Sequence, residues 1–525
     1  MGVGIRARRW VPLTWMALLV STSSFAQEKA SDLLLEAQNQ YRAGQYFSAA
    51  RFAFEAQERD RAYEGQAYSW ITSSLMRAGM PQSASYFFIR TLQAGDKTAI
   101  RRILPFTQEL LVRVGPDLPR KYLIRHTTYE DYDRTNRSAY LFALAKDAIL
   151  LGNADRAIGY IDGMDQASPL FPYGLQLRAA AAAQMGKGAQ ALKDFRACVD
   201  TAGAIQGLDA KTSSAEARDL AARCQAGVAR TLYELGKFED ADREYDRISK
   251  ASFVWPDILF EQSWNAYARG EFNRTLGRLV SYKSPALRFV WNSEVDVLRA
   301  QTYLALCLYE DADQALGEFE KRYVGVARQV KELVEGPEGG NLTRFYQLGK
   351  AALADRLDTS KEIHRLANRF VRGPYFQALV RSEQDLERER MVIRSFGGAS
   401  SSNKQGLPGF LQEVIAWRSG AIAKLGGAFV RNSLLDHHDI LISDFEKMSF
   451  IRIEVLDRLR SVLLKPKLGA GDRVRGVVPT SRRDDQYWWS FNGEFWTDEL
   501  GDYVFGLESQ CKVGLDTSAV GGGEG

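Results

Sequence analysis

The fold is decided by the stretch AGVARTLYELGKFEDADREYDRIS, residues 226–249. Apolar side chains recur there at helical spacing on both sides of Gly236, and glycine is the residue that most readily ends a helix in a tight turn. The stretch therefore predicts two amphipathic helices that pack against each other. The apolar positions are Val228, Leu232 and Leu235 before the turn and Phe238, Ala241, Tyr245 and Ile248 after it.

The spacing between Gly236 and Ala241 recurs through the N-terminal half of the chain. Successive turn glycines are 35, 73, 34, 50 and 34 residues apart. Periods near 34 residues indicate helical hairpins, which bury a core only by stacking on one another. The Gly-x-x-x-x-Ala pairs are Gly44/Ala49, Gly79/Ala84, Gly152/Ala157, Gly186/Ala191 and Gly236/Ala241, and Gly270 follows with Thr275 in the alanine position.

The array is expected to be irregular at three places. Gly115 lies in phase between two of the glycines, but the prolines that follow it predict a degenerate unit. The gap of 50 residues predicts an insertion around residues 201–215, which we expect to form a loop. Glu310 is expected to replace the turn glycine in a last unit that contains Ala315.

These units resemble the tetratricopeptide repeat (TPR). The resemblance rests on a glycine, an aromatic residue two positions later, an alanine five positions later and a further apolar residue, as in Gly236, Phe238, Ala241 and Tyr245. It covers roughly residues 30–325 and implies an α-solenoid. It also implies a concave groove that holds peptides or partner proteins.

The first 26 residues predict a secretory signal peptide. Three arginines between residues 6 and 9 precede an apolar stretch at residues 11–20, and Ser24 and Ala26 supply small residues at a cleavage site. Cleavage after Ala26 leaves 499 of the 525 residues and no later apolar run long enough to span a bilayer. We therefore expect a periplasmic or secreted protein without an integral membrane segment. An uncleaved membrane anchor is the alternative.

Residues 326–466 predict a helical region with a long antiparallel hairpin, whose arms are residues 375–396 and 410–464. A seven-residue apolar spacing in the second arm is typical of coiled-coil-like packing. Two interpretations remain: the hairpin folds back on the solenoid, or residues 410–464 form a docking arm for partners or for self-association. The spacing is carried by Leu434, Leu441, Met448, Val455 and Val462.

Residues 467–515 predict a small aromatic-rich β element, because the Asn492-Gly493 turn signal lies between apolar runs. The element has three interpretations: a cap over the helical hairpin, a docking patch for a partner, or a site that stacks on carbohydrate. Tryptophan and tyrosine dominate protein interfaces, so the aromatic residues are candidate partner-binding positions. They are Tyr487, Trp488, Trp489, Phe491, Phe495 and Trp496.

The stretch from Trp488 to Cys511 resembles the C-terminal signature of TPR proteins in bacterial envelope gliding-motility machineries. The matching residues read Trp-x-x-Phe-Asn-Gly-Glu-x-Trp-x-Asp-Glu-Leu-Gly-x-Tyr. This resemblance implies a structural subunit of a larger periplasmic complex.

Composition and motifs do not favour nucleic-acid binding or catalysis. The net charge is only +4, without a concentrated basic stripe. The four histidines are not spaced as metal ligands, and no phosphate-binding loop or nucleophile motif occurs. We expect no catalytic residue, cofactor or metal site. Cys198 and Cys224 fall on neighbouring predicted helices, where either a disulfide or two buried thiols is possible.

Taken together, the sequence predicts a mainly α protein built from a TPR-like solenoid, a long helical hairpin and a small C-terminal β element. Its expected function is protein–protein assembly in a bacterial envelope, with other envelope proteins or peptide segments as partners. The alternative is a peptidoglycan- or carbohydrate-binding accessory protein that uses the aromatic module. The predicted parts are residues 1–26, 27–325, 326–466, 467–515 and a disordered tail at 516–525.

Overall fold

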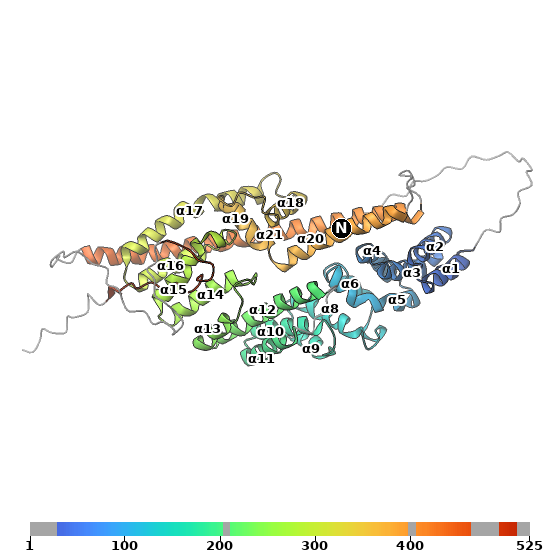
Figure 1. Ribbon diagram of the computed structural model, residues 1–525, viewed down its shortest axis with the longest axis horizontal. Coiled ribbons are helices and arrows are strands. Elements are labelled where there is room, and N and C mark those ends of the chain that lie inside the picture. The colour runs from blue at the N-terminus through green and yellow to red at the C-terminus, as the bar shows by residue number, and fades with distance from the viewer. Residues whose placement is uncertain (1–28, 203–209, 397–405, 464–492, 512–525) are drawn as a thin grey trace, which may run out of the picture.

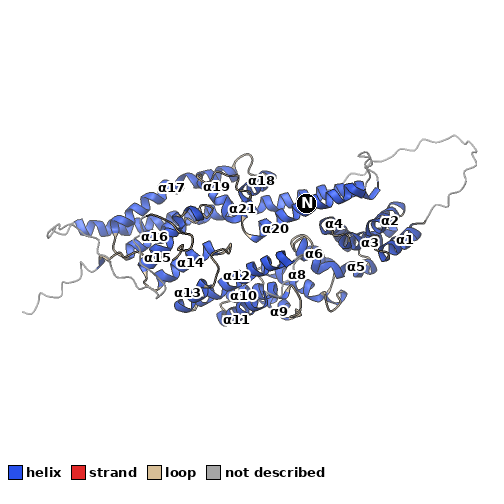
Figure 2. Cartoon of the chain, in the orientation of Figure 1, coloured by secondary structure: helices blue, strands red, loops and turns tan. Residues whose placement is uncertain are grey.

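The computed structural model describes residues 29–202, 210–396, 406–463 and 493–511, and every regular element in those ranges is a helix (Figures 1 and 2). The first half contains α1 (Ala30–Arg42), α2 (Tyr46–Arg59), α3 (Glu64–Arg77), α4 (Pro81–Ala94), α5 (Lys97–Ile103), α6 (Thr107–Arg113), α7 (Arg120–His126), α8 (Arg137–Leu150), α9 (Ala154–Asp162), α10 (Phe171–Gln184) and α11 (Gly188–Thr201). The second half contains α12 (Ala210–Glu234), α13 (Phe238–Asp246), α14 (Trp255–Ala268), α15 (Phe272–Val280), α16 (Glu294–Ala305), α17 (Tyr309–Glu335), α18 (Leu342–Leu353), α19 (Glu362–Val371), α20 (Pro374–Phe396) and α21 (Gly406–Leu463). Short 3-10 helices lie at Arg61–Tyr63, Leu104–Phe106, Tyr129–Asp131, Ser281–Lys283 and Pro285–Leu287.

One turn geometry joins eight helix pairs in the described residues. Between α12 and α13, Gly236 has a φ of 70°, and the Lys237 N–H donates to the Leu232 carbonyl across 2.9 Å. The Ala241 N–H then donates to the Lys237 carbonyl, also at 2.9 Å, which starts α13. The first bond requires a left-handed residue at the turn, because only that conformation brings the chain back to the end of α12. The corresponding left-handed residues are Gly44, Gly79, Gly152, Gly186, Gly270, Cys307 and Asp355.

The alanines that follow these turns lie where neighbouring helices come closest. The side chains of Ala49, Ala84, Ala157, Ala191 and Ala241 are completely buried. Tyr245, one helical turn beyond Ala241, is also buried, and Phe238 packs its ring on Tyr233 with centroids 5.4 Å apart. The stacked pairs form a TPR-like helical repeat fold.

The unit formed by α16 and α17 corrects the prediction at Glu310. Its turn residue is Cys307, with a φ of 56°, and Ala312 follows five residues later, fully buried. Residues 306–312 read LCLYEDA, in register with LGKFEDA at residues 235–241. A cysteine therefore occupies the glycine position, and the turn lies three residues before Glu310.

The predicted loop at residues 201–215 is also wrong at residue 201 and at residues 210–215, which are helical. Helix α11 continues to Thr201, and α12 begins at Ala210, several residues before the expected start. The sequence AEARDLAAR, residues 215–223, is composed mainly of strong helix formers, and α12 extends from it over the less favourable residues 210–214. Residues 203–209 lie outside the described ranges.

Helix α21 is 58 residues long and runs along most of the molecule (Figure 1). It contacts α2 and α4 near its start and α16–α19 farther along, while α20 packs beside it in the opposite direction. The predicted hairpin therefore folds back on the repeats. The seven-residue stripe at Leu434, Leu441, Met448 and Val455 is buried in these contacts, so it is not free for self-association. Val462 has no described side chain.

Gly426 and Gly427 lie in the interior of α21. They lie where α18 crosses it, and a Cβ on Gly427 would come within 1.9 Å of the Leu342 carbonyl oxygen. A Cβ on Gly426 would come within 2.4 Å of the Tyr346 ring. The two glycines are therefore needed for the close approach of the helices.

The predicted C-terminal β element is wrong for the described part of that region. Residues 493–511 form turns and an extended segment that lies over α14, α15 and α16, and they include no strand. Of the chain that the structure describes, no helix is both long and apolar enough to cross a membrane. The predicted signal peptide, the first part of the aromatic module and the tail all lie outside the described residues.

Candidate partner-binding site

The C-terminal segment, residues 493–511, is held on the repeats as an extended peptide. The Asn273 side chain of α15 accepts a hydrogen bond from the Leu507 N–H at 2.8 Å and donates one to the Leu507 carbonyl at 3.0 Å. The Phe505 N–H also donates to the Asn273 carbonyl at 3.0 Å. These hydrogen bonds are made to the main chain of the segment, so the surface recognises an extended conformation rather than one particular side chain.

Apolar side chains of the segment fill pockets between the helices below it. Phe505 and Leu507 pack against a cluster around Leu276, and Leu500 is buried against Trp255. Gly277 permits this contact, because a Cβ there would lie 1.8 Å from the Tyr503 carbonyl oxygen. The surface is thus shaped to fit a chain laid across α15.

A disulfide fixes the end of the C-terminal segment to the array. Cys511 is bonded to Cys307, the left-handed turn residue between α16 and α17, across 204 positions of sequence. The second disulfide joins Cys198 to Cys224, the pair for which the sequence left both states open. All four cysteines of the chain are therefore paired.

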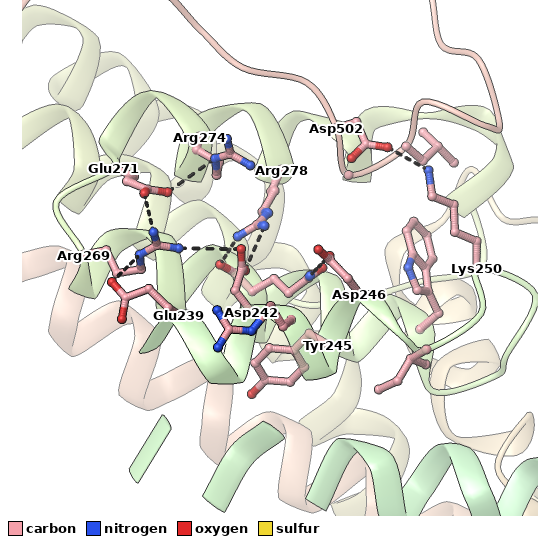
Figure 3. Close-up of a pocket in the computed structure, with 16 residues that line it drawn as sticks. Glu239, Asp242, Tyr245, Asp246, Lys250, Arg269, Glu271, Arg274, Arg278 and Asp502 are labelled. Atoms are coloured by element: carbon pink, nitrogen blue, oxygen red, sulfur yellow. Dashed lines mark hydrogen bonds and ion pairs between the residues drawn. The ribbon is translucent and has the colours of Figure 1, made fainter. Parts of the chain in front are cut away.

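A pocket of about 420 Å³ lies beside the C-terminal segment, between α13, α14 and α15 (Figure 3). Five acidic and five basic side chains line it, together with Tyr245, Ile248, Trp255, Gln262, Leu500 and Gly501. The acidic residues are Glu239, Asp242, Asp246, Glu271 and Asp502, and the basic residues are Arg243, Lys250, Arg269, Arg274 and Arg278.

Most of the charged side chains that line this pocket are joined to one another in ion pairs. Arg269 contacts Glu271 at 2.9 Å, and Arg278 contacts Asp242 at 3.0 Å, as Figure 3 shows. Lys250 reaches over the edge of the pocket to Asp502 of the C-terminal segment at 3.1 Å. The pocket therefore presents charged side chains that already have partners within the protein.

Tyr245 contributes a hydrogen-bond donor next to the pocket. Burial, followed by the nearby Glu261 carboxylate, raises the pKa of Tyr245 well above its ordinary value. Its hydroxyl therefore stays protonated and donates to Glu261 at 3.1 Å. In the described ranges, no three His, Cys, Asp or Glu side chains are grouped closely enough to hold a metal ion.

Two of the predicted partner-binding aromatics are described by the structure. Phe495 packs edge to face on Tyr503, with ring centroids 5.9 Å apart. The backbone N–H of Trp496 donates to the Tyr503 hydroxyl at 3.1 Å, and its side chain is 59% exposed. Tyr487, Trp488, Trp489 and Phe491 lie outside the described residues.

A buried polar junction, which sequence reasoning missed, joins α20 and α21 to the N-terminal repeats. The Glu389 carboxylate accepts hydrogen bonds from the Gln82 and Ser83 N–H groups at 2.8 Å each, so it caps the N-terminus of α4. Arg418 donates to the Gln82 side chain at 3.0 Å and to the Val114 carbonyl at 3.1 Å. Glu389 and Arg418 lie more than 300 positions along the chain from these partners, and no local sequence pattern predicts the contacts.

No protein-family model and no curated protein matches this chain. Among solved structures it is similar to a tetratricopeptide repeat protein from Parabacteroides merdae, with 13% identity and a TM-score of 0.25 over 56% of this chain and 92% of that one. It is similar to the P58(IPK) TPR domain, with 14% identity and a TM-score of 0.19 over 75% and 98%. A circular tandem repeat protein has 16% identity and a TM-score of 0.11 over 81% and 90%.

Proposed function

We propose that this protein is a periplasmic or secreted scaffold that binds other proteins through its helical repeats and its C-terminal segment. The observation that carries the proposal is the way Asn273 holds Leu507 by its main chain. The repeat array holds one extended segment of its own chain in this way, and its uncovered repeats would hold extended segments of partner proteins. The exposed Trp496 ring on the same segment adds an aromatic anchor of the kind common at interfaces.

The proposed location is supported by the disulfides. All four cysteines are joined in two bridges, and disulfides form and persist in oxidising compartments. The signal-peptide pattern at residues 1–26 agrees with that compartment. The resemblance of the stretch from Trp488 to Cys511 extends the proposal to a structural role in a gliding-motility type of envelope machinery.

Cross-linking in the native envelope tests this function. Tagged protein should capture several envelope proteins, with cross-links on residues 30–325 and 493–511. Trp496→Ala should remove the cross-links at residues 493–511, and because Trp496 is exposed, the free energy of unfolding should change by less than about 0.5 kcal/mol.

The matched control is Tyr129→Phe, a change at another exposed aromatic residue far from the C-terminal segment in sequence, which should leave the cross-links intact. If the protein is recovered only with cell-wall fragments, and Trp496→Ala abolishes this association, the glycan-binding alternative would be favoured over the scaffold.

A further inference from the structure

The C-terminal turns of α21 carry an exposed apolar face opposite the buried seven-residue stripe. Phe450, Ile453 and Leu456 are 73%, 65% and 55% exposed. At 100° per residue they lie on one side of the helix, together with Ile442. The end of α21 also extends beyond α16 and α17 at the left of Figure 1.

Two charges flank this face symmetrically. Glu446 and Arg460 lie seven residues before and after Ile453, which places all three in one line along the helix. Both charged side chains are exposed. Their neighbours Arg452 and Glu454 are already paired, with Glu320 and Arg458, whereas Glu446 and Arg460 have no ion-pair partner among the described residues.

The pattern is complementary to itself when reversed. In an antiparallel pair of α21 helices centred on Ile453, Glu446 of each copy lies level with Arg460 of the other. Phe450 of each copy lies level with Leu456 of the other, so apolar side chains meet apolar side chains. A parallel pair would instead bring Glu446 against Glu446 and Arg460 against Arg460, and like charges in contact are unfavourable.

We propose that this face binds a second copy of the chain and forms an antiparallel, two-fold symmetric dimer centred on Ile453. Two-fold contacts use the same patch on both subunits, as this arrangement requires. The paired region, residues 446–460, covers about four helical turns, so the area it buries is at or below the roughly 1,200–2,000 Å² of a stable interface. The dimer therefore forms reversibly at micromolar concentration.

Sedimentation of the mature protein, residues 27–525, measures the association directly. Glu446→Arg alone and Arg460→Glu alone should each weaken the dimer by about tenfold or more, because each creates two like-charge contacts. The double variant restores both pairs in the opposite sense and should return the dissociation constant to within about threefold of the original. Lys331→Glu, a charge reversal on the exposed surface of α17, is the matched control and should have no effect.

A cysteine at the centre gives a second measurement. Ile453→Cys should form a disulfide-linked dimer on mild oxidation, since the two copies of residue 453 meet at the symmetry axis. The native cysteines do not interfere, because all four are paired. A monomer at about 100 µM, or a double variant as weak as the single ones, would overturn the proposal.

Discussion

At the scale of single residues, Glu389 shows how a buried carboxylate serves as a helix cap supplied by another part of the chain. It accepts two backbone N–H groups at the start of α4 and the Ser83 hydroxyl at 2.6 Å. Burial, with a smaller contribution from the nearby Asp385 carboxylate, raises the pKa of Glu389 to about 7 despite these bonds. The folded protein therefore retains a proton at Glu389 at pH values where the unfolded chain has lost it.

This difference makes stability depend on pH in a definite direction. Because the folded pKa lies above the ordinary value of 4.5, the contribution is complete below about pH 4.5 and is lost as the pH rises through 7. Between pH 5.5 and pH 8, the free energy of unfolding should fall by about 2 kcal/mol from this group alone. Urea unfolding at the two pH values should show that Glu389→Gln removes this component.

Glu387 lies on the same helix, is 57% exposed and is paired with Arg390, so Glu387→Gln is the matched control. It should leave the pH dependence unchanged. An equal slope in the wild type and in Glu389→Gln would mean that Glu389 is ionised in the folded protein throughout this range.

At the scale of elements, the contact between α18 and α21 depends on the absence of side chains. Gly349 of α18 also lies in this contact, where a Cβ would meet the Val430 side chain of α21 at 2.9 Å. Glycine inside a helix ordinarily costs about 0.5–1 kcal/mol relative to alanine. At Gly427 that cost is offset by the packing that the close approach allows.

Two alanine substitutions in the same helix should therefore have opposite effects. Gly427→Ala would push a methyl group into the Leu342 carbonyl and should destabilise the protein by about 2 kcal/mol or more. Gly420→Ala meets nothing within 4 Å and should stabilise it by about 0.5–1 kcal/mol. Thermal unfolding monitored by circular dichroism measures both, and the same sign for the two variants would contradict this account.

At the scale of the whole molecule, long-range connections tie the repeat array together. Helix α21 links the first repeats to the last ones, and the C-terminal segment closes over α14–α16. The Cys307–Cys511 disulfide secures that segment, so the loss of this bond should act on the segment first. The Cys198–Cys224 disulfide joins two neighbouring helices, α11 and α12, so it constrains only that pair.

Cys511→Ser should lower the free energy of unfolding by about 3 kcal/mol, since the bond closes a long loop of the unfolded chain. Hydrogen exchange should rise at residues 500–510 and at the Asn273 contact before it rises in α1–α4. The double variant Cys198→Ser/Cys224→Ser should leave exchange at residues 500–510 unchanged. Equal protection of residues 500–510 in Cys511→Ser would show that hydrogen bonds alone hold the segment.

The sequence by itself determined the helical hairpins and their turns. Each hairpin is specified by local features: a left-handed glycine, an alanine five residues later and apolar side chains at helical spacing. Gly236 and Ala241 therefore predict the turn and the helix contact in which they lie. The same pattern missed the turn at Cys307, because it requires a glycine at that position. The turn can be recognised only when residues 306–312, LCLYEDA, are aligned with residues 235–241, LGKFEDA.

Only the tertiary structure decided the path of the C-terminal segment, the junction at Glu389 and the place of α21. The Asn492-Gly493 turn signal between apolar runs predicted a β element at the C-terminus, but the main-chain partner of Leu507 is the Asn273 side chain rather than a neighbouring strand. Glu389 finds its partners 306 and 307 residues away. Local patterns cannot specify such contacts, since they arise when distant segments compete to bury apolar area and satisfy polar groups on the same surface.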